Sequence, residues 1–126
     1  MIGHRVEVLP EERHVRVEVG GELVAESRRA RELRETGHRA RWYLPLEDVR
    51  DDVLEPSEKT SRCPFKGKAS YWSVRAGGEL HRDVVWTYRD PIPKAREIAG
   101  LVCFYDEKVE LTVAPPATPE PARARR

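Results

Sequence analysis

The sequence predicts a mainly β protein: a small single domain of about eight short, mostly antiparallel strands with one or two short helices, arranged as a folded sheet or a partly open barrel. Three observations point to this class. Apolar and charged residues alternate with a period of two over several short stretches, as in half-buried strands. Glycine pairs at 20–21 and 77–78 separate such stretches, as in tight hairpins. The length of 126 residues fits one domain.

The first alternating stretch predicts a β-hairpin. Valines alternate with charged residues over 15–19, and Gly20-Gly21 follows where the chain must turn. Glycine supplies the positive φ that such a turn needs. A two-residue loop would place Val19 opposite Glu22, so we favour a three-residue, bulged loop that keeps one face of the hairpin mostly apolar. This register sets Val19, Val17 and Val15 opposite Leu23, Ala25 and Ser27.

The next segment predicts one short surface helix at about residues 28–36. Ser27 is suited to the N-cap position and Gly37 to closing the helix. Ala30 and Leu33 fall on one helical face. Opposite charges four residues apart add support, namely Arg28 with Glu32 and Arg31 with Glu35.

Further strands and short connections follow. Residues 40–45 predict a strand that Pro45 stops, and an acidic connection over 46–60 holds one helical turn at 47–49. A hairpin-rich region follows over 70–91, around Gly77-Gly78. Within it, alternation predicts one face with Trp72, Val74 and Ala76 and another with Tyr71, Ser73 and Arg75.

The C-terminal part predicts less regular structure. Residues 91–100 form a proline-bounded turn with one helical turn, and residues 101–113 form two strands around the turn at 106–108. Four of the ten prolines fall in 114–126, a segment without apolar periodicity. We therefore expect a β-rich domain over 1–113 and a disordered Pro/Arg-rich tail over 114–126.

Charge and hydropathy narrow the expected partners. With 23 basic and 22 acidic residues the net charge is +1, which gives no overall attraction to nucleic acid or to an anionic membrane. The arginines between 28 and 41 are expected to form a solvated face rather than an RNA-binding one. The sequence has neither an apolar run long enough for a membrane span nor a signal peptide, so we expect a cytoplasmic protein. The two cysteines, 40 positions apart, are expected to be reduced thiols.

The stretch TSRCPFKGKASYW, residues 60–72, carries the clearest chemistry. Lys66 and Lys68 could favour the thiolate of Cys63 and so make it a nucleophile; the alternative is a small, half-buried structural cysteine. The Lys66-Gly67-Lys68 turn could also bind an anion through ammonium and backbone N–H groups. It is not a P-loop, because Arg62 stands at the first glycine position and Ala69 at the final hydroxyl position. Cys103 is expected in the core.

Two further groups of residues are candidates for a binding site. Glu47, Asp48, Asp51 and Asp52 could hold a divalent cation, but their spacing does not place two of them on one ion, so we predict no metal site. The aromatic residues occur mostly in pairs on predicted strands, so one member of each adjacent pair faces away from the other. Half of them can therefore build the core while the rest line a pocket.

Several segments together resemble a bacterial family known as domain of unknown function 427, also labelled a nucleotidyltransferase-like domain. In chain order they are VRVEVGGELVAESRRARELRETG, WYLPLEDV, LEPSEKTSRCPFKGKASYWSV, VVWTYRDPIPKA and IAGLVCFYDEKVEL. The resemblance covers about residues 5–113, and the block C-P-[FY]-K-G-x-A-x-Y-[WY] is its most specific mark. It implies a small, mostly β domain.

The resemblance also implies which positions the family keeps best. They are Ser27, Arg29, Glu35, Tyr43, Pro45, Asp48, Cys63, Pro64, Lys66, Gly67, Tyr71, Trp72, Trp86, Tyr88 and Pro91. It implies no activity beyond the transferase label. The chain lacks the helix-opening Gly-Ser motif followed by paired aspartates with which familiar nucleotidyltransferases hold metal and triphosphate, so we give that label no weight.

These observations lead to a main hypothesis and two alternatives. The main hypothesis is a binding module for a small polar or anionic ligand, nucleotide-like or carboxylate, with no cofactor specified. Lys66 and Arg29 would hold the anion and Asp48 would orient it; the aromatic walls would be Tyr43, Tyr71, Trp86 and Tyr88. One alternative is an enzyme that uses Cys63 as nucleophile, or Lys66 and Asp48 as acid and base. The other is a structural or interaction module, of which a homodimer is one form.

Overall fold

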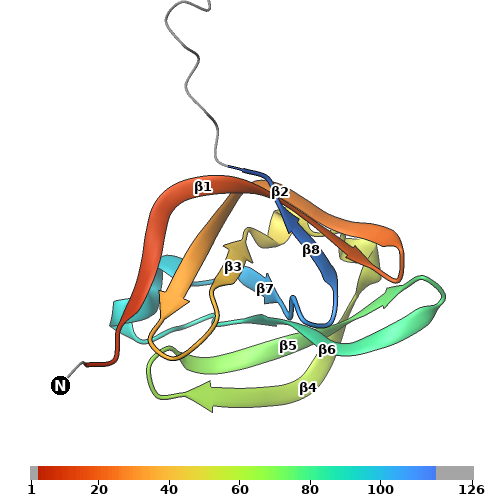
Figure 1. The fold of residues 1–126 in the computed structure, drawn as a ribbon. Coiled ribbons are helices and arrows are strands. Elements are labelled where there is room, and N and C mark those ends of the chain that lie inside the picture. The colour runs from red at the N-terminus through yellow and green to blue at the C-terminus, as the bar shows by residue number, and fades with distance from the viewer. Residues whose placement is uncertain (1–2, 116–126) are drawn as a thin grey trace, which may run out of the picture.

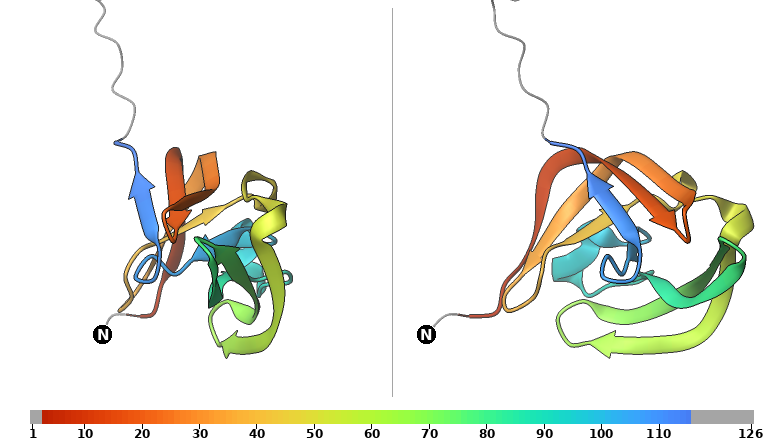
Figure 2. Two further views of the ribbon diagram at one scale, coloured as in Figure 1. Left: turned by 90° about the vertical axis from the view of Figure 1, so that its right-hand side faces the viewer. Right: turned by 45° about the vertical axis from the view of Figure 1, so that its right-hand side comes forward.

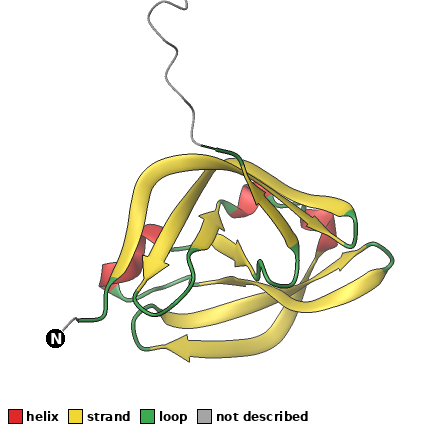
Figure 3. Ribbon diagram, in the orientation of Figure 1, coloured by secondary structure: helices red, strands yellow, loops and turns green. Residues whose placement is uncertain are grey.

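The fold is one open, antiparallel sheet of eight strands, which a computed structural model describes over residues 3–115 (Figure 1). The strands are β1 (Val6–Val19), β2 (Glu22–Glu35), β3 (Arg41–Leu44), β4 (Leu54–Cys63), β5 (Gly67–Ala76), β6 (Glu79–Thr87), β7 (Val102–Phe104) and β8 (Glu110–Val113). Three short 3-10 helices lie between strands: η1 (Leu46–Asp48), η2 (Asp51–Val53) and η3 (Pro93–Ile98) (Figure 3). The predicted mainly β fold class is confirmed.

The sheet folds over on itself without closing. Its strand order is β4-β5-β6-β7-β3-β2-β1-β8, so β4 and β8 are its two edges and the structure is not a closed barrel. The β1–β2 hairpin and β8 form one layer, the strands β4, β5 and β6 form the opposite layer, and β3 and β7 connect the two (Figures 1 and 2). The concave side that this curvature creates holds most of the core.

The first hairpin differs from the predicted register at its turn and agrees with it further along. Val19 pairs directly with Glu22, so the loop has two residues, and the three-residue loop that we favoured is wrong. A bulge between Val17 and Glu18 then shifts the register. Beyond this bulge the predicted pairs are present: Val17 with Ala25 and Val15 with Ser27. The extra residue restores the apolar face that a two-residue turn alone would have broken.

The helix predicted at about 28–36 is wrong, because this segment continues β2. It pairs with β1 over its whole length, with register shifts at two further bulges. Buried residues therefore recur every third position, at Ser27, Ala30 and Leu33, before alternation returns at Glu35. A bulged strand thus produced the spacing that resembles one face of a helix.

Other connections were predicted with mixed success. The predicted strand at 40–45 and the helical turns at 47–49 and 91–100 are confirmed by β3, η1 and η3. The acidic connection is shorter than expected, because its second half forms the edge strand β4. An edge strand has only one neighbour and little burial, so its sequence is as polar as that of a loop.

The C-terminal strands β7 and β8 do not pair with each other. β7 lies between β3 and β6, and β8 pairs with β1. Of the tail expected at 114–126, residues 116–126 lie outside the described residues. Ala114 belongs to the fold: its N–H donates to the carbonyl oxygen of His14 at 2.9 Å, and its own carbonyl accepts from Arg13.

Two hydrophobic clusters fill the fold. The first consists mainly of valines from β1, β2, β5 and β6, with Leu44 and Phe104. The second is richer in aromatic residues and includes the fully buried Cys103, which confirms its predicted place in the core. Strand β5 serves both clusters, since Val74 and Ala76 belong to the first and Tyr71 to the second. The candidate site lies at the second cluster.

Candidate ligand-binding site

A cavity of about 370 Å³ opens at the aromatic cluster. Its volume lies within the range of small-molecule sites, which is roughly 300–1,000 Å³. The sheet brings its walls together from β2, β3, β6, the β4–β5 connection and the segment after β7. The lining residues are Leu33, Glu35, His38, Arg39, Arg41, Tyr43, Arg62, Cys63, Pro64, Phe65, Lys66, Tyr71, Trp86, Tyr88 and Tyr105.

Aromatic side chains from neighbouring strands form the inner wall. Tyr43 on β3 and Trp86 on β6 both pair with Cys103 on β7, so the three residues lie in one row across the sheet. The Trp86 indole N–H donates to the Tyr43 hydroxyl at 3.0 Å, and Tyr105 lies against Trp86 with ring centroids 4.4 Å apart. Burial raises the pKa of Tyr43, so its hydroxyl stays neutral. This wall is uncharged and held by contacts between its own side chains.

Tyr71 and Tyr88 complete the aromatic surface. The Tyr71 hydroxyl shares a hydrogen bond of 2.8 Å with Ser61 on β4, and the Lys59 ammonium lies 4.6 Å from the ring centroid. Burial, followed by the interaction with the Tyr71 hydroxyl, raises the pKa of Tyr105 to about 12. Burial likewise raises the pKa of Tyr88. The Tyr88 and Tyr105 phenols can therefore exchange hydrogen bonds with a ligand without carrying charge near neutral pH.

A buried ion pair between Lys66 and Glu35 forms one end of the pocket. Lys66 lies in the β4–β5 connection, where its carbonyl accepts from the Ile92 N–H at 3.0 Å, and Glu35 is the last residue of β2. The other Glu35 carboxylate oxygen lies 2.8 Å from His4 Nε2 and 3.9 Å from His38 Nε2. The carboxylate thus joins three segments of the chain.

The charge state of Glu35 follows from these neighbours. Burial by itself raises the pKa of this carboxyl, but the hydrogen bond and charge of Lys66, with a further hydrogen bond from His4, outweigh burial and lower the pKa below its usual range. Glu35 is therefore ionised and compensates the Lys66 charge. Lys66 presents a neutral pair to the pocket rather than an isolated cation.

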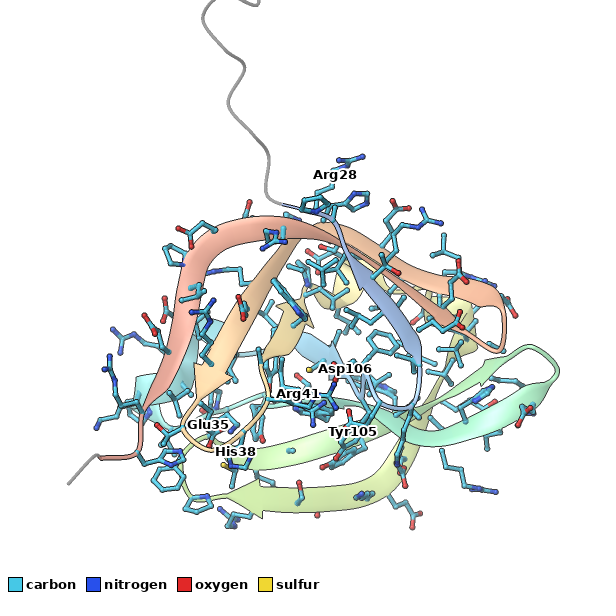
Figure 4. All side chains as sticks on the ribbon, viewed as in Figure 1. Arg28, Glu35, His38, Arg41, Tyr105 and Asp106 are labelled. Atoms are coloured by element: carbon cyan, nitrogen blue, oxygen red, sulfur yellow. The ribbon has the colours of Figure 1, made fainter. Side chains whose placement is uncertain are left out.

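Two arginines flank the aromatic wall on the opposite side. The Arg41 guanidinium carbon lies 5.2 Å from the Trp86 ring centroid, and Arg41 Nη1 lies 2.6 Å from carboxylate oxygens of both Asp106 and Glu107. Arg39 contacts the same two carboxylates at 3.3 and 3.7 Å. The hydrogen bond from Arg41 lowers the pKa of Glu107 to about 2. Figure 4 shows Arg41 and Asp106 together in the middle of the molecule.

The rim of the pocket carries exposed polar groups. Arg62 is exposed and makes no ion pair within residues 3–115. Cys63 is half-buried and carries a free thiol. His38 lies beside Glu35, and Figure 4 places both at the end of β2, far from Arg28. The site thus combines apolar aromatic walls, a compensated ion pair and cationic groups at its mouth.

The structure brings together six of the eight residues that the sequence predicted for the site. Those that line the pocket are Tyr43, Cys63, Lys66, Tyr71, Trp86 and Tyr88. Arg29 and Asp48 lie elsewhere and contact each other at 3.4 Å, and the Ser27 hydroxyl donates to Asp48 at 2.6 Å. These contacts fasten η1 to β2. The proposed acid–base pair of Lys66 and Asp48 is not brought together, because each side chain has a different partner.

Sequence reasoning missed several residues of the pocket, chiefly Glu35, His38, Arg39, Arg41 and Tyr105. Glu35 was missed because the helix predicted at 28–36 placed it on a solvated face, paired with Arg31. Period-two alternation could have found the arginines, because positions 39 and 41 precede Tyr43 on one side of the strand. The family resemblance named Glu35 among the kept positions without assigning it a role.

Most of the acidic residues considered as metal ligands have other partners in the structure. Within residues 3–115, no group of three or more His, Cys, Asp or Glu side chains is arranged to hold a metal ion. In the acidic segment, Asp48 is bound by Ser27 and Arg29, and Asp52 by Arg50 at 2.7 Å.

Among residues 3–115, no helix is both long and apolar enough to cross a membrane.

Comparison with known proteins identifies one family. Residues 7–115 match the family described as domain of unknown function (DUF427), with the short name NTP_transf_9. The match covers nearly all of the described residues and confirms the resemblance that the Cys-Pro-Phe-Lys-Gly block indicated. The search of curated proteins found no match.

Proposed function

The chain belongs to the family of domain of unknown function 427, and from that premise we propose that it binds a small anionic ligand in the aromatic pocket. The main support for this proposal is that aromatic and cationic side chains from separate parts of the chain line the same cavity. Tyr43, Tyr71, Trp86 and Tyr88, which are distant in sequence, line one cavity together with Arg39, Arg41 and Arg62. Such a combination offers a planar or apolar group a surface to pack against and offers its anionic substituent a cationic mouth.

The balance of charge around the cavity supports an anionic ligand. Four lining side chains are cationic, Arg39, Arg41, Arg62 and Lys66, and one lining side chain, Glu35, is a carboxylate. Glu35 compensates Lys66, and the acidic turn after β7 offsets Arg39 and Arg41. Arg62 remains without an ion pair in the described residues. It is therefore the side chain best able to pair with a ligand, through the planar fork of its guanidinium.

The test is a thermal-shift screen of nucleotides, sugar phosphates and small carboxylates, with calorimetry of each hit. We expect Arg62→Ala to weaken binding about tenfold or more, because it removes one charge-assisted hydrogen-bonding group. Tyr105→Ala, which removes a half-buried wall from the same cavity, should weaken the same ligands. Lys66→Ala is less informative, since it leaves the Glu35 carboxylate buried without its partner.

Arg28→Ala is the matched control for Arg62→Ala. Arg28 is exposed on β2, and Figure 4 shows it on the opposite side of the molecule from Glu35 and His38. The two variants lose the same charge, so they separate a site effect from a change of net charge. Hits that respond equally to both variants, and not to Tyr105→Ala, would refute the proposed pocket.

An enzyme that uses Cys63 is the second candidate. It is favoured by the position of the Cys63 thiol, which is half-buried and lines the same cavity as Lys66 and Tyr88. Labelling with iodoacetamide across pH tests it. A catalytic thiolate should react well below the ordinary thiol pKa of about 8.5. A thiol that follows the ordinary profile, or that is unreactive in the folded protein, rules out thiolate catalysis.

A further inference from the structure

A second cavity lies next to the β4–β5 hairpin, at the segment that follows β6. It has a volume of about 610 Å³, and its polar lining comes from Arg62, Lys68, Ser70, Arg89 and Asp90. Arg62 also lines the aromatic pocket. The two cavities therefore meet at this arginine, which lies on the edge strand of the sheet.

Three cations line this cavity, and we call Arg62, Lys68 and Arg89 the row. Arg62 on β4 is the direct partner of Lys68 on β5. Arg89 follows β6, whose last pair with β5 at this end is Thr87 with Ser70, and its side chain lines the same cavity. All three side chains are exposed, and within residues 3–115 none of them makes an ion pair. The Arg89 guanidinium lies over the Trp72 ring, with 5.7 Å between the guanidinium carbon and the ring centroid.

Arg62 and Lys68 place like charges opposite each other on β4 and β5. Like charges directly opposite each other on neighbouring strands repel. Elsewhere on the surface most arginines have carboxylate partners, as Arg29, Arg50 and Arg75 do. The row has one lining carboxylate, Asp90, against three cations. An external polyanion would supply the missing charge, and guanidinium groups suit phosphate oxygens through paired hydrogen bonds.

We propose that the row of Arg62, Lys68 and Arg89 binds the phosphate groups of a ligand whose planar head occupies the aromatic pocket. This inference rests on the proposed function and specifies its ligand class as a nucleoside polyphosphate or a molecule of the same chemistry. The head packs against the aromatic wall, and the phosphate chain passes Arg62 into the second cavity. Three cations match a short phosphate chain, whereas a nucleic acid strand would need a longer basic surface.

Calorimetry on the full chain tests the proposal with two kinds of probe. The series adenosine, AMP, ADP and ATP, in buffer with EDTA and at constant ionic strength, varies the phosphate chain with one head group. Tripolyphosphate tests the row without any head group. We expect tripolyphosphate to bind, and affinity to rise at least tenfold from adenosine to ATP, a difference of about 1.4 kcal/mol.

A pair of double variants assigns this gain to the row. Lys68→Ala with Arg89→Ala should abolish tripolyphosphate binding and remove the gain along the series, without changing the affinity for adenosine. Arg28→Ala with Arg82→Ala is the matched control. Both of its arginines are exposed, lie outside the two cavities and make no ion pair in the described chain, and the net charge changes equally. The control should retain both effects.

The outcomes separate this inference from the proposed function. One outcome is a ligand that loses affinity in Tyr105→Ala but whose affinity does not rise with the number of phosphates, or rises equally in both double variants. That outcome refutes phosphate binding by the row and still supports the pocket. A second outcome is that tripolyphosphate binds at the row but no ligand loses affinity in Tyr105→Ala. That outcome refutes the pocket, and with it a single site formed by the pocket and the row. Single-stranded DNA that binds more tightly than ATP, and loses that affinity in the row variant, overturns the assignment to a small ligand.

Discussion

At the scale of single residues, the buried pair of Lys66 and Glu35 links the site to the stability of the fold. The two residues are 31 positions apart, and less than a tenth of each side chain is exposed. Removing an ion from water is costly, and the partner ion offsets that cost only while both charges are present. We therefore expect each member of the pair to depend on the other.

The first prediction is a non-additive double-mutant cycle. Lys66→Met and Glu35→Gln should each lower the free energy of unfolding by about 3–5 kcal/mol, because each change disrupts a buried charge pair. The double variant should cost clearly less than the sum of the two, since neither charge is left behind. Urea unfolding of the four proteins measures the coupling. Additive losses would contradict the pairing.

The second prediction concerns acid. The pKa of Glu35 is lower in the folded protein than its ordinary value of 4.5, so the folded state favours the ionised form. Its contribution to stability is complete above that value and is lost as pH falls through the lower, folded pKa. Urea unfolding between about pH 6 and pH 3 should therefore show a steeper acid loss in the wild type than in Glu35→Gln. Parallel curves would refute this role of Glu35.

At the scale of elements, the tips of the two glycine hairpins touch each other. A Cβ atom on Gly77 would lie 2.4 Å from the carbonyl oxygen of Gly20, a distance that real side chains do not tolerate. The Gly77 N–H also donates to Glu22 at 3.1 Å. The β1–β2 hairpin therefore packs tip to tip against the β5–β6 hairpin, which helps to hold the two layers in place.

The third prediction compares two neighbouring glycines. Gly77 and Gly78 both have positive φ, 64° and 83°, but a Cβ atom on Gly78 would meet no atom within 4 Å. Gly78→Ala should cost about 1–2 kcal/mol of backbone strain. Gly77→Ala should cost substantially more, because it also pushes the hairpins apart. The difference in urea midpoint isolates the tip contact, and equal losses would show that the contact contributes nothing.

At the scale of the whole molecule, the order of the strands creates the site. The central strands lie in the order β6-β7-β3-β2, so β7 pairs with β3 although these two strands are far apart in the chain. This order brings Trp86, Tyr43 and Glu35 to the same concave side, where the β4–β5 connection adds Lys66. Strand β8 lies away from the pocket and covers the outer edge of β1.

The fourth prediction separates stability from the pocket. A chain that ends at residue 109 lacks β8 and with it Leu111 and Val113, which pack against the first hydrophobic cluster. It should lose roughly 2–4 kcal/mol of unfolding free energy, in keeping with two partly buried apolar side chains and their strand pairing. A chain that ends at residue 115 keeps every described strand and is the control. Equal urea midpoints for the two chains would contradict a structural role for β8.

The sequence predicted the fold better than it predicted the site. Alternation and glycine pairs are local signals, so most strands and both hairpin turns could be recognised. Strand β2 was misread because bulges changed its apolar spacing, and β4 because an edge strand buries little. Four aromatic members of the site, Tyr43, Tyr71, Trp86 and Tyr88, were found through strand alternation, whereas Tyr105 was missed. Glu35 and Arg41 were missed because their partners, Lys66 and Glu107, lie 31 and 66 positions away.

By itself, the sequence determined the mainly β class, most turns and the family, because each depends on residues that are close together in the chain. Only the tertiary structure decided which charges meet. It paired Lys66 with Glu35, placed Arg29 and Asp48 away from the pocket, and brought Arg62, Lys68 and Arg89 to the lining of one cavity. The physical reason is that strand order and bulged register set these long-range contacts, and neither can be read from the period of a single strand.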